Sequence, residues 1–194
     1  MKCETRIGVF ICECGSNIAG AVNCTELMEF AKLMPDVVCV VVNRYTCAEP
    51  GQLEIQRYVR EQNLNRVVVA SCTPKMHEQT FRNCVRDAGL NPYLMEMANI
   101  REQCSWVHPF DKTKATQKAK DLVKSAVARA RLLEPQIELE VPVTQAALVI
   151  GGGIAGIQAS LDIANSGYPV WLAENEPSIG GIMSQLNKTY PTID

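Results

Sequence analysis

The glycine-rich segment Gly151–Gly156 is the stretch that most constrains what this chain can fold into. A short apolar run, Ala147–Ile150, leads into the spacing Gly151-x-Gly153-x-x-Gly156. An amphipathic segment follows, and a second apolar run then ends in Glu174. This order predicts a strand, a glycine turn, a helix and a strand with a terminal acid, which is the pattern of a dinucleotide-binding βαβ unit.

Each glycine has a separate role in such a unit. Gly151 permits the tight turn, Gly153 lets the backbone approach a pyrophosphate, and Gly156 lets the helix pack closely on the strand. The N–H groups at the start of the helix attract phosphate, and Glu174 is placed to accept hydrogen bonds from a ribose 2′-hydroxyl. The segment therefore predicts a nucleotide site in preference to a plain glycine-rich turn.

Composition excludes several classes of protein. The 194 residues are 47% hydrophobic and 21% charged, which is ordinary for a globular chain of one large or two small domains. The net charge of −2 supplies no basic field for nucleic acid. No apolar run reaches the ~18 residues of a membrane span, and the N-terminus lacks a secretory signal. We therefore expect a cytoplasmic protein whose nine cysteines are metal ligands, reactive thiols or core residues and do not form disulfides.

Residues before position 135 alternate between strand-like and helix-like segments. The strands are expected at residues 6–11, 37–42, 66–70 and 93–98. The helices are expected from a cap at Asn23 or Thr25 to residue 34, from after Gly51 to about residue 63, and at residues 76–88 and 111–133. The apolar stripe of the last helix is expected to comprise Ala115, Ala119, Leu122, Ala126, Ala130 and Leu133. This alternation predicts a parallel sheet with right-handed crossovers.

The predicted architecture is thus an α/β chain with two parts. Residues 1–134 form a small doubly wound parallel-sheet domain, and residues 135–145, interrupted by two prolines, form a linker. Residues 146–194 form the first βαβ unit of a Rossmann-like domain.

Five cysteines follow the ends of the four predicted strands. Because functional groups of open parallel sheets gather at the carboxyl ends of the strands, we expect these thiols at one edge, sharing a metal centre. The five are Cys12 and Cys14 after the first strand, Cys47 after the second, Cys72 after the third and Cys104 after the fourth. We expect Cys24, Cys39 and Cys84 to be small buried apolar residues.

The spacing of the cysteines leaves the metal open between iron and zinc. Neither a repeated zinc knuckle nor a compact ferredoxin run is present. Thiolates from separate loops suit a [4Fe–4S] cluster with an unusual motif, and they also suit zinc. A neighbouring fold able to carry flavin favours the redox centre, with Cys14, Cys47, Cys72 and Cys104 as the expected ligands and Cys12 as the substitute.

Other polar residues near the strand exits are weaker candidates. His77 and His108 are expected to be structural. Lys75 and Arg101 either stabilise a negatively charged cluster, dock a partner or are simply solvated.

Several motifs together carry a resemblance to a known family. They are Cys12-Glu-Cys14-Gly-Ser-Asn-Ile-Ala-Gly20, Ala70-Ser-Cys72-Thr-Pro-Lys-Met-His-Glu78, Gly89-Leu-Asn-Pro-Tyr-Leu94, the segment from Ala98 to His108, and Gly151-Gly-Gly-Ile-Ala-Gly-Ile-Gln158. Over essentially its whole length, the chain resembles the A subunit of heterodisulfide reductase, the iron–sulfur flavoprotein of anaerobic electron-transfer complexes.

The resemblance implies a [4Fe–4S] cluster in the first domain and an FAD domain of thioredoxin-reductase type in the second. Residues 178–181 then belong, with Glu174, to the FAD adenosine and pyrophosphate site. The cofactor-binding residues implied are Gly151, Gly153, Ile154, Ala155, Gly156, Glu174, Asn175 and Gly181. The family's flavin splits electron pairs between two acceptors. The implied partners are other heterodisulfide reductase subunits, an electron-donating hydrogenase or dehydrogenase subunit, and a second copy of the full-length protein.

Family members run to several hundred residues, so we expect this chain to be a fragment. A UGA codon read as a stop is one way in which such an end arises. Two rival hypotheses remain: a zinc-stabilised module that binds NAD or an adenine nucleotide, and a truncated chain that is inactive by itself. We expect the fragment to bind its cluster but to hold FAD weakly or not at all.

Overall fold

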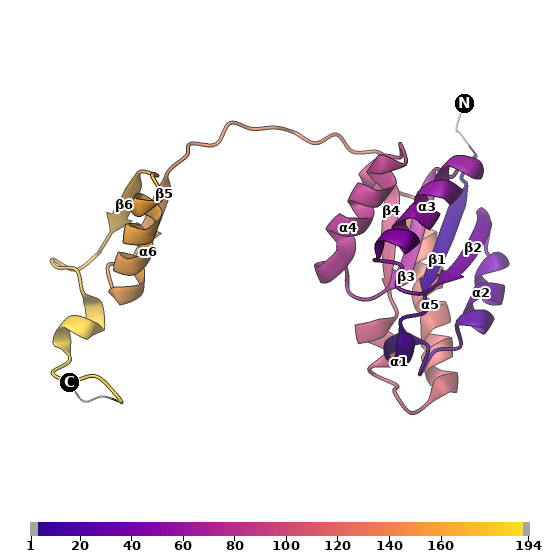
Figure 1. Cartoon of the computed structure of the whole chain (residues 1–194), viewed down its shortest axis with the longest axis horizontal. Helices are drawn as coiled ribbons and strands as arrows, with labels where there is room; N and C mark the ends of the chain where they lie inside the picture. The colour runs from indigo at the N-terminus through magenta and orange to yellow at the C-terminus, as the bar shows by residue number, and fades with distance from the viewer. Residues whose placement is uncertain (1–3, 192–194) are drawn as a thin grey trace. The chain divides into compact units, whose positions relative to one another are not determined.

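The computed structural model describes residues 4–191, which divide between Ile137 and Glu138 into two units. Figure 1 shows the sheet of the first unit, whose strands are β1 (Ile7–Cys12), β2 (Val37–Asn43), β3 (Arg66–Ser71) and β4 (Met95–Asn99). All neighbouring strands pair in parallel in the order β2-β1-β3-β4. The predicted four-stranded parallel sheet is therefore confirmed.

Helices cover both faces of this sheet (Figure 1). On one face lie α2 (Cys24–Lys32) and α5 (Lys112–Ala130), and on the other lie α3 (Glu49–Glu61) and α4 (Pro74–Asp87). Val9 of β1 packs in the core under the first pair of helices, and its neighbour Phe10 packs in the core under the second pair. Burial on both faces explains why the strands read as continuous apolar runs.

Local signals in the sequence account for most of the helix boundaries. The Asn23 side chain accepts a hydrogen bond from the Glu26 N–H, so it caps α2 as predicted. Asp111 caps α5 in the same way, through the N–H of Lys114. Gly89 has a φ of +89° just after α4, a conformation that glycine adopts without strain.

The structure corrects the sequence prediction in three places. Pro92–Leu94 forms a 3₁₀ turn, η1, capped by Asn91, so the fourth strand begins at Met95 and not at Tyr93. Val123 and Val127 join the buried stripe of α5, whereas Leu122 is only partly buried. Two short elements after strand ends were not predicted: α1 (Gly15–Ile18) and a π-helical turn, η2 (Arg101–Ser105).

The second unit is much smaller. It contains β5 (Ala147–Ile150), α6 (Ile154–Asn165), β6 (Val170–Ala173) and a 3₁₀ turn, η3 (Gly181–Gln185). Strands β5 and β6 pair in parallel, with Ala147 opposite Val170. Among residues 138–191, no hydrophobic side chain is buried. In the described part of the chain as a whole, no helix is both long enough and apolar enough to cross a membrane.

Candidate metal centre and nucleotide site

The first candidate site lies where β1 and β3 end. In this strand order the chain leaves β1 toward one side of the sheet and β3 toward the other, and such switch points are where open α/β sheets bind ligands. Cys12 is the last residue of β1, and Cys72 directly follows β3. Both side chains are buried.

Cys14 is held by the turn that follows β1. The Glu13 N–H donates to the Asn43 carbonyl at 2.8 Å, which keeps the chain beside β2 after the strand has ended. The Cys14 carbonyl then accepts hydrogen bonds from the N–H groups of Asn17 and Ile18, at the start of α1. These bonds fix the Cys14 backbone and leave its side chain partly exposed.

Cys47 lies on the turn between β2 and α3. Gln52 donates its side-chain N–H to the Cys47 carbonyl at 2.7 Å. A Cβ atom at Gly51 would lie only 2.7 Å from the Cα and carbonyl oxygen of Thr46. This close approach of α3 to the turn requires glycine, and it sets the position of Cys47.

Strand register places four of the cysteines at one edge of the sheet, because Cys12 lies opposite Asn43 of β2 and Ile11 lies opposite Ala70 of β3. Burial raises the pKa of Cys14, and the charges of Cys12 and Cys47 raise it further. Burial also raises the pKa of Cys47, as does the charge of Cys12. The pKa of Cys72 is raised by burial and by Cys47, against the lowering effect of Arg101. Cys12, Cys14, Cys47 and Cys72 therefore follow strand ends at one edge of the sheet, and Arg101 follows the end of β4 at the same edge.

Cys104, the ligand expected after the fourth strand, is engaged by a backbone carbonyl. It lies in the π-helical turn η2, and its thiol donates to the carbonyl of Ala115 in α5 at 3.0 Å. The side chain is fully buried, and burial raises its pKa to about 11, opposed by the charge of Lys118. Its thiol therefore packs in the core beneath α5, in the same cluster of buried residues as Cys12.

The chemistry of this donor set, which is all sulfur, fits an iron–sulfur cluster. Across residues 4–191, no three His, Cys, Asp or Glu side chains are placed to hold one metal ion. Tetrahedral zinc needs sulfur atoms about 2.3 Å from the metal, whereas four iron atoms and their sulfides fill a larger space between the thiolates. The hydroxyl of Ser71, next to Cys72, is buried without a hydrogen-bond partner and could donate to a sulfide.

The second candidate site is the glycine turn between β5 and α6. Gly151 has a φ of +102°, and a Cβ atom at Gly156 would lie 1.9 Å from the Gly151 carbonyl oxygen. Both positions therefore require glycine. No side chain caps the start of α6 after Gly153, so the N–H groups of Ile154 and Ala155 face the space where an anionic ligand would bind.

Glu174, at the end of β6, is oriented toward this turn. Its carboxylate accepts hydrogen bonds from the N–H groups of Gly152 at 2.6 Å, Asn175 at 2.7 Å and Glu176 at 3.1 Å. These bonds, led by that from Glu176, lower the pKa of Glu174. Gly180 donates its N–H to the Gly152 carbonyl at 2.7 Å, which brings Gly181 beside the turn.

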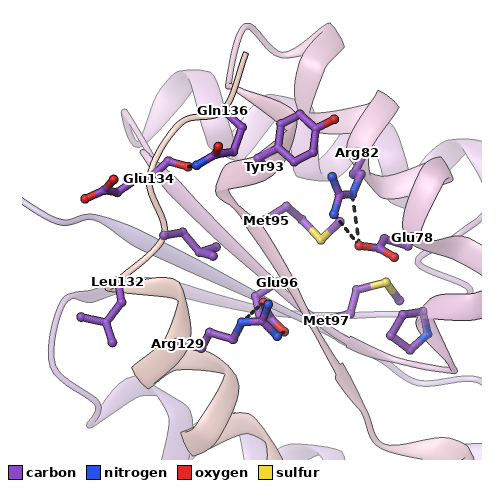
Figure 2. A pocket seen from close by; sticks show the side chains of 12 residues that line it. Glu78, Arg82, Tyr93, Met95, Glu96, Met97, Arg129, Leu132, Glu134 and Gln136 are labelled. Atoms are coloured by element: carbon purple, nitrogen blue, oxygen red, sulfur yellow. Dashed lines mark hydrogen bonds and ion pairs between the residues drawn. The ribbon is translucent and has the colours of Figure 1, made fainter. Parts of the chain in front are cut away.

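A cavity of about 570 Å³ lies elsewhere, beside the edge strand β4. Figure 2 shows two ion pairs among its charged side chains. Arg82 pairs with Glu78 at 2.6 Å, and Arg129 pairs with Glu96 at 3.2 Å. None of its lining residues is a cysteine, so the cavity does not belong to the predicted metal centre.

Comparison with known proteins gives the class of this chain. No family model matches it. It is 60% identical over 191 residues to the second A-type iron–sulfur subunit of the CoB–CoM heterodisulfide reductase of Methanopyrus kandleri, an alignment that covers 98% of this chain and 29% of the relative. It is 55% identical to the A-type subunit of the H(2):CoB-CoM heterodisulfide,ferredoxin reductase of Methanothermobacter thermautotrophicus, over 98% of this chain and 29% of that protein.

A third relative is the A-type iron–sulfur subunit of the CoB–CoM heterodisulfide reductase of Methanocaldococcus jannaschii, which is 54% identical over 97% of this chain and 29% of the relative. All three names denote a component of a reductase, and two of them denote an iron–sulfur protein. The chain belongs to the family of heterodisulfide reductase A subunits, as a region that spans about 29% of the length of these relatives.

Proposed function

We propose that this chain is the part of an electron-transfer protein of this family that holds a [4Fe–4S] cluster through Cys12, Cys14, Cys47 and Cys72. The observation that carries the proposal is that these four cysteines follow the ends of β1, β2 and β3 at one edge of the sheet, around its switch point. In this proposal Cys12 replaces Cys104, the ligand predicted from the sequence, because the Cys104 thiol is engaged with the carbonyl of Ala115.

The residues around the thiols suit one-electron transfer. When bound, the cluster accepts and gives up one electron at a time, at a potential that depends on burial, charge and hydrogen bonds to sulfur. Cys12 and Cys72 are buried and would keep their side of the cluster away from water. Cys14 and Cys47 are partly exposed and would form the side that an electron donor or acceptor approaches.

The second unit is proposed as the first part of an FAD site. Gly151, Gly153 and Gly156 shape the turn, and Ile154 and Ala155 supply N–H groups for the pyrophosphate. Glu174 would accept hydrogen bonds from the ribose hydroxyls. Asn175 and Gly181 lie beside Glu174 and Gly153, at the two ends of the adjoining loop. Because one face of β5 and β6 is uncovered, we expect residues 138–194 alone to hold FAD weakly.

The activity of the whole protein is a further part of this proposal. The names of the relatives mention ferredoxin, hydrogen and F420H2 as reactants. We infer that the complete protein passes electrons between FAD and its clusters by flavin-based bifurcation. It would work with the other heterodisulfide reductase subunits, an electron-donating hydrogenase or dehydrogenase subunit, and a second copy of itself.

Anaerobic purification with metal analysis tests the cluster. We expect a brown protein with about four iron and four sulfide per chain, and an electron paramagnetic resonance signal after reduction. Stoichiometric zinc without sulfide would refute the cluster and favour the zinc module. Stoichiometric FAD retained through gel filtration would show that the flavin part of the expectation is wrong.

Two single variants distinguish the possible ligand sets. Cys12→Ser removes a proposed ligand and should abolish or strongly reduce iron and sulfide binding. Cys104→Ala should retain both, because its thiol bonds to a backbone carbonyl in the core. Cys39→Ala, in the interior of β2, is the matched control for the loss of a cysteine outside the site. Retention in Cys12→Ser with loss in Cys104→Ala would restore Cys104 as the fourth ligand.

A further inference from the structure

Arg101 occupies a defined place beside the four thiols. The N–H of Ile100 donates to the carbonyl of Ser71 at 2.8 Å, so the chain leaves β4 directly alongside Cys72. The Arg101 side chain is only 15% exposed. Its Nε and Nη2 donate to one carboxylate oxygen of Glu102, at 3.1 and 2.7 Å.

Trp106, which follows the π-helical turn η2, and Met76 of α4 also contact the guanidinium group. The Trp106 N–H donates to the Arg101 carbonyl at 2.9 Å, and this five-residue spacing stacks the two residues. The guanidinium carbon therefore lies 4.8 Å from the centre of the Trp106 ring, which Asn17 anchors by a hydrogen bond to the indole N–H. Met76 contacts the guanidinium through its sulfur at 3.4 Å.

This arrangement differs from an ordinary solvated arginine. A carboxylate, an aromatic ring and a thioether contact the guanidinium, and the side chain is mostly buried, so its charge is less screened than that of an exposed arginine. The guanidinium lies between two of the cysteine segments, because Ile100 bonds to Ser71 beside Cys72 and Trp106 bonds to Asn17 in α1, the helix that follows Cys14.

We propose that Arg101 is a positioning residue that raises the reduction potential of the cluster held by Cys12, Cys14, Cys47 and Cys72. This inference rests on the proposed function. A cluster bound by four thiolates carries net negative charge, and reduction adds one more electron to it. A fixed positive charge nearby stabilises the reduced form more than the oxidised form, so the potential rises.

The test is a redox titration of the reconstituted full chain with Arg101→Met, followed by electron paramagnetic resonance. At the wild-type midpoint potential, we expect the ratio of reduced to oxidised cluster to fall at least about tenfold, which for a one-electron couple is a shift of about 59 mV. Arg101→Lys should recover most of the shift because it keeps the charge. Glu102→Gln, which removes the neighbouring anion, should shift the potential in the opposite direction.

Arg82→Met is the matched control. Arg82 also bonds to a glutamate, Glu78 at 2.6 Å, and it also lies over a ring, that of Tyr93 at 4.5 Å (Figure 2). It lines the cavity beside β4, which contains no cysteine, so its loss should leave the potential unchanged.

The outcomes separate the two proposals. A wild-type chain without a cluster refutes the proposed function. A wild-type cluster whose potential is the same in Arg101→Met refutes the role of Arg101 alone. If Arg101→Met fails to retain its cluster, Glu102→Gln decides, because an unchanged or lowered potential in that variant also overturns the inference.

Discussion

The two units of this chain use the same βαβ pattern but differ in how fully the faces of their sheets are covered. In the first unit, four strands are covered on both faces, and side chains such as Phe10 and Phe81 are fully buried. In the second unit, two strands carry a single helix, and Leu148 and Trp171 remain 65% and 60% exposed. A βαβ sequence therefore gives a stable core only when further chain covers the other face of its sheet.

The same difference applies to the two candidate sites. The thiols of the first unit come from three strand exits, which the two cores hold at one edge. The glycine turn of the second unit is held by local hydrogen bonds such as those of Glu174 and Gly180. We expect the first site to be formed before its ligand binds, and the second to depend on additional chain or on FAD for its order.

Separating the two units should give the largest effect. A polypeptide of residues 1–137 should unfold cooperatively at the same temperature as the whole chain, because both cores lie within it. A polypeptide of residues 138–194 should show no cooperative transition, because it buries no hydrophobic side chain among its described residues. Thermal circular dichroism of both polypeptides measures this, and a cooperative transition in 138–194 would contradict the comparison.

Truncating one aromatic side chain in each unit compares how much each unit contributes to the unfolding free energy of the whole chain. Phe81→Ala empties a fully buried site in the core beneath α3 and α4 and should cost about 3–5 kcal/mol of unfolding free energy. Trp171→Ala, in the open sheet, should change that free energy by less than about 0.5 kcal/mol. Urea titration of both variants gives the two values. Similar losses would mean that the second unit has a core of its own.

The smallest expected effect is on the pH dependence of stability, through two glutamates whose pKa values are shifted in opposite directions. Burial raises the pKa of Glu96 in the first unit, despite its partner Arg129, so the folded state binds its proton more tightly than the unfolded state does. This contribution to stability is present below the unfolded pKa and is lost as the pH rises through the folded pKa. From about pH 4 to 7, the wild type should lose less than about 1 kcal/mol relative to Glu96→Gln.

Glu174 in the second unit should behave in the opposite way. Its backbone hydrogen bonds lower its pKa, so their contribution is present above the unfolded pKa and is lost as the pH falls. Carboxyl titration by nuclear magnetic resonance compares the two residues in one sample. A Glu174 that titrates above Glu96 would show that the local hydrogen bonds of the glycine turn do not persist in solution.

By itself, the sequence determined the features that depend on local chemistry. Strand and helix periods, the cap at Asn23 and the glycines of the βαβ turn act over a few residues, so the order of elements and the parallel sheet could be predicted. The position of five cysteines after strand ends could also be predicted, because the ends of parallel strands lie at one edge of the sheet.

Only the tertiary structure decided which of these residues meet. The π-helical turn rotates Cys104 toward Ala115 and stacks Arg101 on Trp106, and its sequence carries no cap or periodic signal that indicates such a turn. The burial of Val123 in place of Leu122 depends on how α5 is rotated on the sheet. Spacing along the chain fixes where a side chain begins, but its direction depends on the packing of elements that are distant in sequence.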